Sequence, residues 1–206
     1  MHKTPSSVFE HFPYRLVLAS SSPRRQELIR YLGLPFEVKV PDIEEKHRPE
    51  ETAAEYVQRN SLEKAEIVFH SLQTEQPTVV IGSDTIGWFQ DQVLEKPRDA
   101  EDAKHMLTSM SGQTHEVLTG LALVYGQGKS FSSLQRVVST KVSFKQLTSQ
   151  EIAYYVATGE PLDKAGSYGI QGIGGFLVER VEGSYSNVVG LPLVELVELL
   201  RSLPPA

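Results

Sequence analysis

The apolar positions of the chain follow two periodicities, one typical of strands and one typical of amphipathic helices. Strands are predicted over residues 15–20, 36–40, 78–82, 85–89, 92–94, 115–125, 130–144 and 176–181. Helices are predicted over residues 23–32, 49–70 and 99–110, and after Thr148 and Pro192. Because strands and helices alternate without a repeat or a linker, the pattern predicts an α/β fold with a mixed sheet in one domain, 14–206.

Helix starts carry recognisable polar signals. Ser22 followed by Pro23 predicts an N-cap with Pro at the first helical position. Asp99 with Asp102, and Thr148 with Glu151, are each spaced as capping boxes. These signals predict where three of the helices begin.

Composition narrows the class of protein. The 206 residues carry 20 Lys and Arg against 26 Asp and Glu, a net charge of −6 that argues against a dedicated nucleic-acid binder. The absence of Cys excludes disulfides, thiolate zinc sites and a cysteine nucleophile. Residues 1–13 lack the apolar core of a secretion signal and are expected to form a flexible leader, and no apolar run reaches membrane-spanning length. We therefore expect a cytoplasmic protein with no membrane partner.

The serine turn at 20–22 is a candidate anion site. Arg24 and Arg25 lie in the first turn of the predicted helix, where positive charge opposes the helix dipole unless an anion binds there. Backbone amides, hydroxyls and guanidinium groups together suit a phosphate. The alternative is an ordinary capped helix with two solvated arginines.

Lys64 interrupts an apolar stripe. Ala53, Val57, Lys64 and Val68 fall on one face of the helix predicted over 49–70. A lysine on such a face either extends past the core to solvent or meets an anion.

Asp84 lies just past the end of the strand predicted over 78–82, whose unbroken apolar run indicates a strand covered on both faces. Ligands of open α/β sheets bind beyond the carboxyl ends of strands, so Asp84 is a candidate catalytic acid. Further carboxylates that could bind Mg²⁺ or Mn²⁺ are Glu44, Glu45 and Asp163. Further lysines that could bind phosphate are Lys96 and Lys164. Any one of them, taken alone, is more often a solvated surface charge.

Several common binding and catalytic motifs are incomplete or absent in this sequence. Gly128-Lys129-Ser130 matches the last three residues of a phosphate-binding loop, but Leu123 occupies the position of the first glycine of that motif. The segment is predicted to be the turn of a hairpin. No dinucleotide-binding glycine motif, zinc-protease motif or nucleophile elbow occurs. A glycine cluster over 166–175 indicates backbone that bends or is approached closely.

Six segments in order resemble one family. They are LASSSPRR (18–25), GSDT (82–85), EKP (95–97), SGQTH (111–115), DKAGSYGIQG (163–172) and NVVGLP (187–192). Together they resemble the Maf family of nucleotide pyrophosphatases, first named as septum-formation inhibitors, over roughly residues 16–200.

The resemblance implies hydrolysis of a nucleoside triphosphate between its α and β phosphates, with a divalent metal, as a house-cleaning activity. It implies that Asp84 is the general base. It implies that the metal is held by Glu45, Asp84 and Asp163. It implies that the triphosphate is held by Ser22, Arg25, Lys64, Lys96 and Lys164.

Three further positions concern the base. Family members acting on dTTP and UTP carry Arg, Thr and Gln at base-reading positions, which here are Arg24, Thr85 and Gln171. A Gln amide can donate to O4 of thymine or uracil and accept from N3–H, whereas cytosine presents the reverse polarity. The resemblance therefore implies dTTP and UTP as substrates, and modified pyrimidine nucleotides as further ones.

Two alternatives stay open: a pyrophosphatase of 7-methyl-GTP, and a non-enzymatic regulator of septum formation. The family fold implies an extended mixed sheet flanked by helices, as in inosine triphosphatases, in two lobes with the site in a central cleft. The resemblance implies a small-molecule nucleotide as the partner and leaves homodimerisation open.

Overall fold

The computed structural model describes residues 7–43, 45–48, 50–72 and 74–206. Within them, seven strands form a mixed sheet of order β2-β1-β3-β5-β6-β7, with β4 paired to β3. The strands are β1 (Arg15–Ala19), β2 (Phe36–Val38), β3 (Thr78–Phe89), β4 (Gln92–Leu94), β5 (Thr114–Gln127), β6 (Ser130–Phe144) and β7 (Val178–Glu182). The helices are α1 (Pro23–Arg30), α2 (Ala53–Leu72), α3 (Ala100–Met110), α4 (Ser149–Ala157), α5 (Tyr185–Val189) and α6 (Leu193–Arg201).

Strand pairing confirms the predicted α/β class. β1 runs parallel to both β2 and β3, whereas β3 with β4 and β6 with β7 are antiparallel. The predicted tight turn between β3 and β4 is also confirmed, because Gln90 and Asp91 have φ of 51° and 59°, as a two-residue hairpin turn requires.

The chain groups into two compact units. Unit 1 comprises Met1–Asp84, Thr119–Val138 and Gly190–Ala206, and unit 2 comprises Thr85–Leu118 and Ser139–Val189. Strands β3, β5 and β6 contribute residues to both units. Each unit has its own apolar core, and the central cleft expected from the family resemblance stays a prediction.

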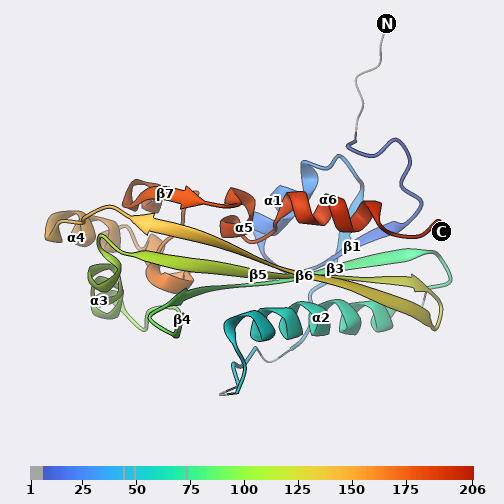
Figure 1. Cartoon of the computed structure of the whole chain (residues 1–206), viewed down its shortest axis with the longest axis horizontal. Coiled ribbons are helices and arrows are strands. Elements are labelled where there is room, and N and C mark those ends of the chain that lie inside the picture. The colour runs from blue at the N-terminus through green and yellow to red at the C-terminus, as the bar shows by residue number, and fades with distance from the viewer. Residues whose placement is uncertain (1–6, 44, 49, 73) are drawn as a thin grey trace, which may run out of the picture. The chain divides into compact units, whose positions relative to one another are not determined.

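In unit 1, α2 lies along one face of the strands, and α1 and α6 lie on the other face (Figure 1). The core under α2 joins the apolar face of this helix to β1, β3 and β5. Its buried members are Val17, Ala19, Ala65, Val68, Phe69, Val80, Ala122 and Val124. This burial fixes which face of α2 meets the strands, and Lys64 belongs to that face.

In unit 2, α3 and α4 cover the strands. Tyr155 and Phe144 are the largest side chains buried there, and they pack with Leu107 and Met110 of α3. His115 and Tyr168 meet Phe144 edge to face, with ring centroids 5.2 and 4.8 Å away. The core of unit 2 is thus strongly aromatic.

Local hydrogen bonds explain the helix starts. Ser22 caps α1 by accepting from Arg25 N, with Pro23 following, and Thr148 and Glu151 form the predicted capping box of α4. The capping box predicted for α3 is wrong. Asp99 does accept from Asp102 N at 2.9 Å, but the Asp102 carboxylate accepts from Arg98 N at 3.0 Å instead of returning to Asp99.

Several element boundaries differ from prediction. β3 continues to Phe89, so Asp84 lies inside a strand rather than beyond its end. α2 begins at Ala53, because Thr52 Oγ1 caps it by accepting from Glu55 N at 3.2 Å, and Pro49 lies outside the described residues. The last strand begins at Val178, because a 3₁₀ segment, Ile173–Leu177, precedes it.

The predicted leader is described from residue 7 onward; residues 1–6 lie outside the described part. Val8 N and Ser7 Oγ both donate to Leu32 O, at 3.0 and 3.1 Å, so this stretch packs against the end of α1. Among the described residues, no helix combines the length and apolar character needed to cross a bilayer.

Candidate active site

Asp84 is the centre of the candidate site in unit 1. It lies within β3, the residue is only 4% exposed, and both carboxylate oxygens accept hydrogen bonds. Lys64 Nζ lies 2.7 Å from Oδ1, and Asn60 Nδ2 lies 3.0 Å from Oδ2. A buried carboxylate held this way has a fixed orientation, as a group that must aim at a reacting atom requires.

Opposing effects set the charge of Asp84. Burial raises the pKa of its carboxyl, but the Lys64 ammonium, the Asn60 amide and the charge of Arg25 outweigh burial and hold the pKa below its usual range. The carboxylate is therefore ionised at neutral pH and can accept a proton or a cation.

Lys64 meets anions rather than solvent. Its side chain is buried, so the alternative that it extends past the core to water is wrong. Its Nζ lies between Asp84 Oδ1 at 2.7 Å and Glu45 Oε1 at 2.9 Å. Two carboxylates from distant parts of the chain thus converge on one cation.

A glycine lets α2 come close enough for these contacts. A Cβ added at Gly82, two residues before Asp84, would lie 2.0 Å from Ser61 O of α2 and 3.0 Å from Ala65 N. Only glycine allows backbones this close. Because Asn60 and Lys64 lie one turn apart on α2, this close approach brings both side chains to the Asp84 carboxylate.

The acidic loop before α2 is tied down by Arg59, which sequence reasoning missed. Arg59 forms a salt bridge with Glu51, and its Nη2 donates to Lys46 O at 3.0 Å. Its Nη1 donates to Asn60 Oδ1 at 3.0 Å, which leaves the amide nitrogen of Asn60 facing Asp84. Glu45 is held on this loop, whereas Glu44 lies outside the described residues. Asn60 could have been found, because it lies one turn before Lys64 on the same helix.

The serine turn also belongs to unit 1. Arg25 Nε donates to Gly190 O at 2.8 Å, and its Nη1 lies 3.4 Å from Ser20 Oγ. Burial lowers the pKa of Arg25, while the carboxylates of Asp84 and Glu45 oppose that effect. Arg24 is exposed on α1. Ser22, Arg25, Lys64, Glu45 and Asp84 therefore all belong to unit 1, and the charge of Arg25 acts on Asp84.

The remaining predicted residues lie in unit 2. They are Thr85, Lys96, Asp163, Lys164 and Gln171. Lys96, Asp163 and Gln171 are exposed. The segments carrying Lys96 and Lys164 are joined, because Gly166 N donates to Glu95 O at 3.0 Å.

Lys164 has internal partners. Its Nζ lies 2.7 Å from Asp163 Oδ1 and donates to Glu160 O at 2.8 Å. Sequence reasoning missed Glu160, whose carboxylate accepts from the backbone of residues 173 and 174. The glycine cluster over 166–175 is the sequence signal for this contact, because a carboxylate can come this close to backbone amides only where side chains are absent.

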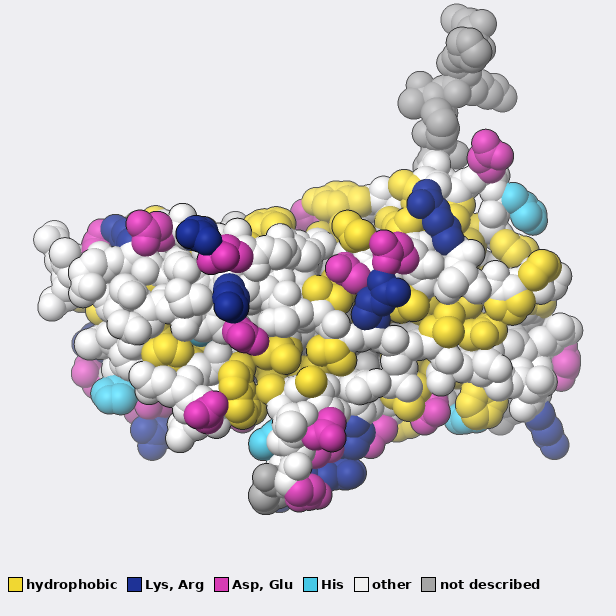
Figure 2. Space-filling view, in the orientation of Figure 1, with side chains coloured by type: hydrophobic (Ala, Val, Ile, Leu, Met, Phe, Trp, Pro, Cys, Tyr) yellow, Lys and Arg dark blue, Asp and Glu magenta, His cyan; other side chains and the backbone are white. Residues whose placement is uncertain are grey.

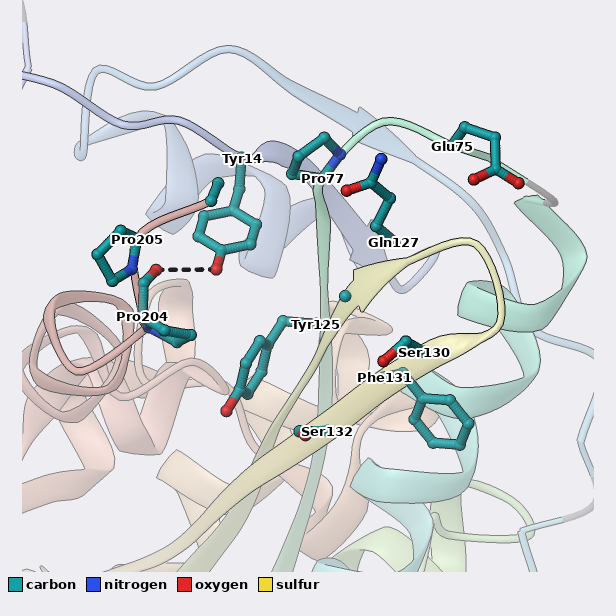
Figure 3. Close-up of a pocket in the computed structure, with 12 residues that line it drawn as sticks. Tyr14, Glu75, Pro77, Tyr125, Gln127, Ser130, Phe131, Ser132, Pro204 and Pro205 are labelled. Carbon is teal, nitrogen blue, oxygen red and sulfur yellow. Dashed lines mark hydrogen bonds between the residues drawn. The ribbon is translucent and has the colours of Figure 1, made fainter.

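A cavity of about 450 Å³ at the other end of β3 in unit 1 contains none of the predicted site residues. Figure 3 shows it between the two tyrosines Tyr14 and Tyr125, the prolines near the C-terminal end, and the β5–β6 hairpin. Tyr14 Oη donates to Pro204 O at 2.9 Å across one wall. This hairpin contains Gly128, at φ 59°, which confirms that the segment resembling a phosphate-binding loop is a turn.

Neither sign of charge dominates the face of the molecule shown in Figure 2. On the face shown in Figure 2, acidic and basic side chains are interspersed over the described residues rather than gathered by sign. This agrees with the net charge of −6. Electrostatic attraction to a polyanion needs a basic surface.

Comparisons with known proteins give the family. The family model described as Maf-like protein matches residues 15–203. The chain is 54% identical over 187 residues to proteins named dTTP/UTP pyrophosphatase in Shigella dysenteriae serotype 1 and Escherichia coli O157:H7, with 91% of this chain and 92% of each relative covered. A Shigella flexneri protein named nucleoside triphosphate pyrophosphatase matches equally, at 54% over the same shares.

A solved nucleoside-triphosphatase / dITP/XTP pyrophosphatase from Mycobacterium abscessus aligns with 65% of this chain and 75% of its own, at 19% identity and a TM-score of 0.36, too low to carry an argument. The family match and the relatives are independent of it. Since that match spans nearly the whole chain and the curated relatives share more than half of the aligned residues, this chain belongs to the Maf family.

Proposed function

We propose that this protein is a nucleoside triphosphate pyrophosphatase that hydrolyses dTTP and UTP to the monophosphate and pyrophosphate. The observation that carries the proposal is the buried, ionised Asp84, held by Lys64 and Asn60 in unit 1. The names of the curated relatives support the same activity and the same two substrates.

Asp84 acts as the general base. Its carboxylate accepts the proton of a water molecule as the water oxygen bonds to the α-phosphorus. The bond from that phosphorus to the α–β bridging oxygen breaks, and pyrophosphate leaves with the electron pair. A positioned base contributes roughly 10² to 10⁴ in rate.

Cationic and hydroxyl groups hold the triphosphate. In unit 1 these are Ser22, Arg25 and Lys64, and in unit 2 they are Lys96 and Lys164. Their value lies in neutralising charge on the phosphoryl oxygens in a site with little water, where electrostatic interactions are strong. Lys64, which pairs with Asp84 and Glu45 in the structure, would exchange part of that pairing for phosphate oxygens.

The carboxylates fit a divalent cation. Asp84 and Glu45 already converge on one positive charge, and hard oxygen donors are what Mg²⁺ and Mn²⁺ prefer. Among the described residues no group of three acidic or histidine side chains forms a ready metal cluster. Asp84 and Glu45, with Asp163, would hold the ion, which would supply charge neutralisation at the phosphates.

Arg24, Thr85 and Gln171 read the base. Gln171 can donate to O4 and accept from N3–H of thymine or uracil, while cytosine would leave both amide groups mispaired. Each buried polar group left unpaired costs about 1–3 kcal/mol, enough for strong rejection. Modified pyrimidine nucleotides with the same edge would also be accepted. Homodimerisation and a cytoplasmic location stay predictions.

A substrate panel tests the activity. The protein is incubated with Mg²⁺ or Mn²⁺ and, separately, dTTP, UTP, CTP, dATP, GTP and 7-methyl-GTP, and pyrophosphate is separated from orthophosphate. Pyrophosphate from dTTP and UTP is the expected result. Pyrophosphate mainly from 7-methyl-GTP would overturn the base-reading residues, and no turnover would favour a non-enzymatic regulator of septum formation.

The variant Asp84→Asn tests the mechanism. It keeps the size of the side chain but removes the proton acceptor, so turnover should fall below detection while the circular dichroism spectrum stays unchanged. Asp91→Asn, at the exposed hairpin turn of unit 2, is the matched control and should keep full activity. Near-normal turnover by Asp84→Asn would refute the role of Asp84.

A further inference from the structure

The backbone around Gln171 is rich in glycine. Residues 169–175 contain four glycines and form a bend followed by the 3₁₀ segment Ile173–Leu177. Glycine-rich backbone has high conformational freedom, yet a side chain that discriminates bases must be held within a fraction of an ångström. Besides its own backbone hydrogen bonds, Gly172 N to Gly169 O and Gly175 N to Gly172 O, contacts from outside the segment can restrict it.

The support is a carboxylate and a phenol from the region of α4. Glu160 Oε2 accepts from Ile173 N at 2.9 Å, and Oε1 accepts from Gly174 N at 3.0 Å. Tyr155 Oη donates to Glu160 Oε1 at 2.9 Å and accepts from Gly169 N at 3.1 Å. Backbone amides on both sides of Gln171 therefore end on one connected pair of side chains.

The glycines are what allow this approach. A Cβ at position 172 would lie 2.4 Å from Glu160 Oε2, and a Cβ at position 174 would lie 2.4 Å from the hydroxyl of Tyr155. Neither contact is sterically allowed. The absence of side chains at Gly172 and Gly174 therefore leaves the space in which Glu160 and Tyr155 reach the backbone.

Glu160 is ionised and also touches Lys164. Burial raises the pKa of its carboxyl, but the amides of Gly174 and Ile173 and the Tyr155 hydroxyl hold the pKa below its usual value. Hydrogen bonds to an ionised acceptor are about twice as strong as neutral ones. The backbone oxygen of the same residue accepts from Lys164 Nζ at 2.8 Å. Tyr155 is fully buried, so the pair is anchored in the core of unit 2.

We propose that Glu160, supported by Tyr155, is a specificity-determining positioning residue that holds the backbone on both sides of Gln171 so that its amide can read the pyrimidine base. This role rests on the proposed function, because it presupposes that Gln171 contacts the base. Glu160 itself acts only through the segment that it holds.

The test compares substrates on the same sample of each variant. Glu160→Gln has nearly the same shape, but its amide group would face a backbone N–H, and Tyr155→Phe removes the partner of Gly169 N. We measure the ratio of kcat/KM for dTTP to that for CTP. The ratio is independent of any inactive fraction, and we expect it to fall by about tenfold or more in Glu160→Gln and by less in Tyr155→Phe.

Matched controls separate positioning from general stability. Tyr154→Phe alters the neighbouring tyrosine, which is 60% exposed, and Glu179→Gln alters an exposed glutamate of β7; both should keep the wild-type ratio. Adding Glu160→Gln to Gln171→Ala should leave the ratio of the single variant unchanged, since Glu160 acts through Gln171.

The outcomes distinguish the two claims. A wild-type ratio in Glu160→Gln, with or without a lower melting temperature, overturns the role of Glu160 and leaves the proposed function intact. Wild-type protein that hydrolyses dTTP and CTP equally refutes the proposed base selectivity, and wild-type protein that hydrolyses no nucleotide refutes the proposed function; either result also overturns this role.

Discussion

His115 should make the stability of this protein sensitive to mildly acidic pH. The imidazole is 2% exposed, its Nε2 lies 2.8 Å from Tyr168 Oη, and its Nδ1 has no partner among the described residues. Burial lowers the pKa of His115 from 6.5 to about 4. The folded protein therefore keeps the ring neutral at pH values where the unfolded chain protonates it.

The sign and size of the effect follow from this difference. Because the unfolded chain binds the proton first, the free energy of unfolding decreases as pH falls from about 6.5 to about 4 and changes no further below that range. A difference of about 2.5 pH units corresponds to about 3 kcal/mol at most, and about 2 kcal/mol of it is lost between pH 7 and pH 5. Such a loss is a substantial part of the total stability of an ordinary domain.

Urea unfolding at pH 7, 6 and 5 measures the loss. The single tryptophan, Trp88, belongs to unit 2 with His115, so its fluorescence reports on the relevant unit, with circular dichroism as a second probe. His115→Gln keeps a polar atom near the position of Nε2 and cannot titrate, so it should lose about 2 kcal/mol less than wild type over this range. His105→Gln, at an exposed position of α3, is the matched control. Parallel losses in wild type and His115→Gln would refute the reasoning.

Three further predictions concern the proposed chemistry. Gln171→Glu should lose the preference for dTTP over CTP, because a carboxylate cannot donate to O4; an unchanged substrate profile in the same panel would remove Gln171 from the base-reading set. Removing divalent ions with EDTA should abolish turnover without changing the circular dichroism spectrum, and Mg²⁺ or Mn²⁺ should restore it; full activity in EDTA would contradict the proposed metal. Gly82→Ala should separate α2 from β3, because its Cβ would lie 2.0 Å from Ser61 O, so stability should fall by about 1–3 kcal/mol and kcat more than tenfold. Unchanged kcat in that variant would show that the close approach is not needed for activity.

The sequence by itself determined the features that depend on near neighbours in the chain. The cap at Ser22, the capping box at Thr148, the β3–β4 turn and the amphipathic face of α2 all involve residues within a few positions of one another, where steric and hydrogen-bonding rules are local. Each family motif is also a contiguous run of residues, so the sequence alone indicates the Maf family, in agreement with the family model.

The tertiary structure decided which partners the charged groups meet. The stripe on α2 marked Lys64 as unusual, but whether it reached solvent or an anion depended on β3 and the acidic loop, at positions 84 and 45. In the same way, the contacts of Glu160 are with the backbone amides of Ile173 and Gly174, more than ten residues later in the chain. The partner of a buried charge depends on which other charged or polar groups the fold places beside it. The depth of burial then determines how strong their interaction is. Sequence periodicity reports which face of an element is buried, whereas only the folded chain determines what that face touches.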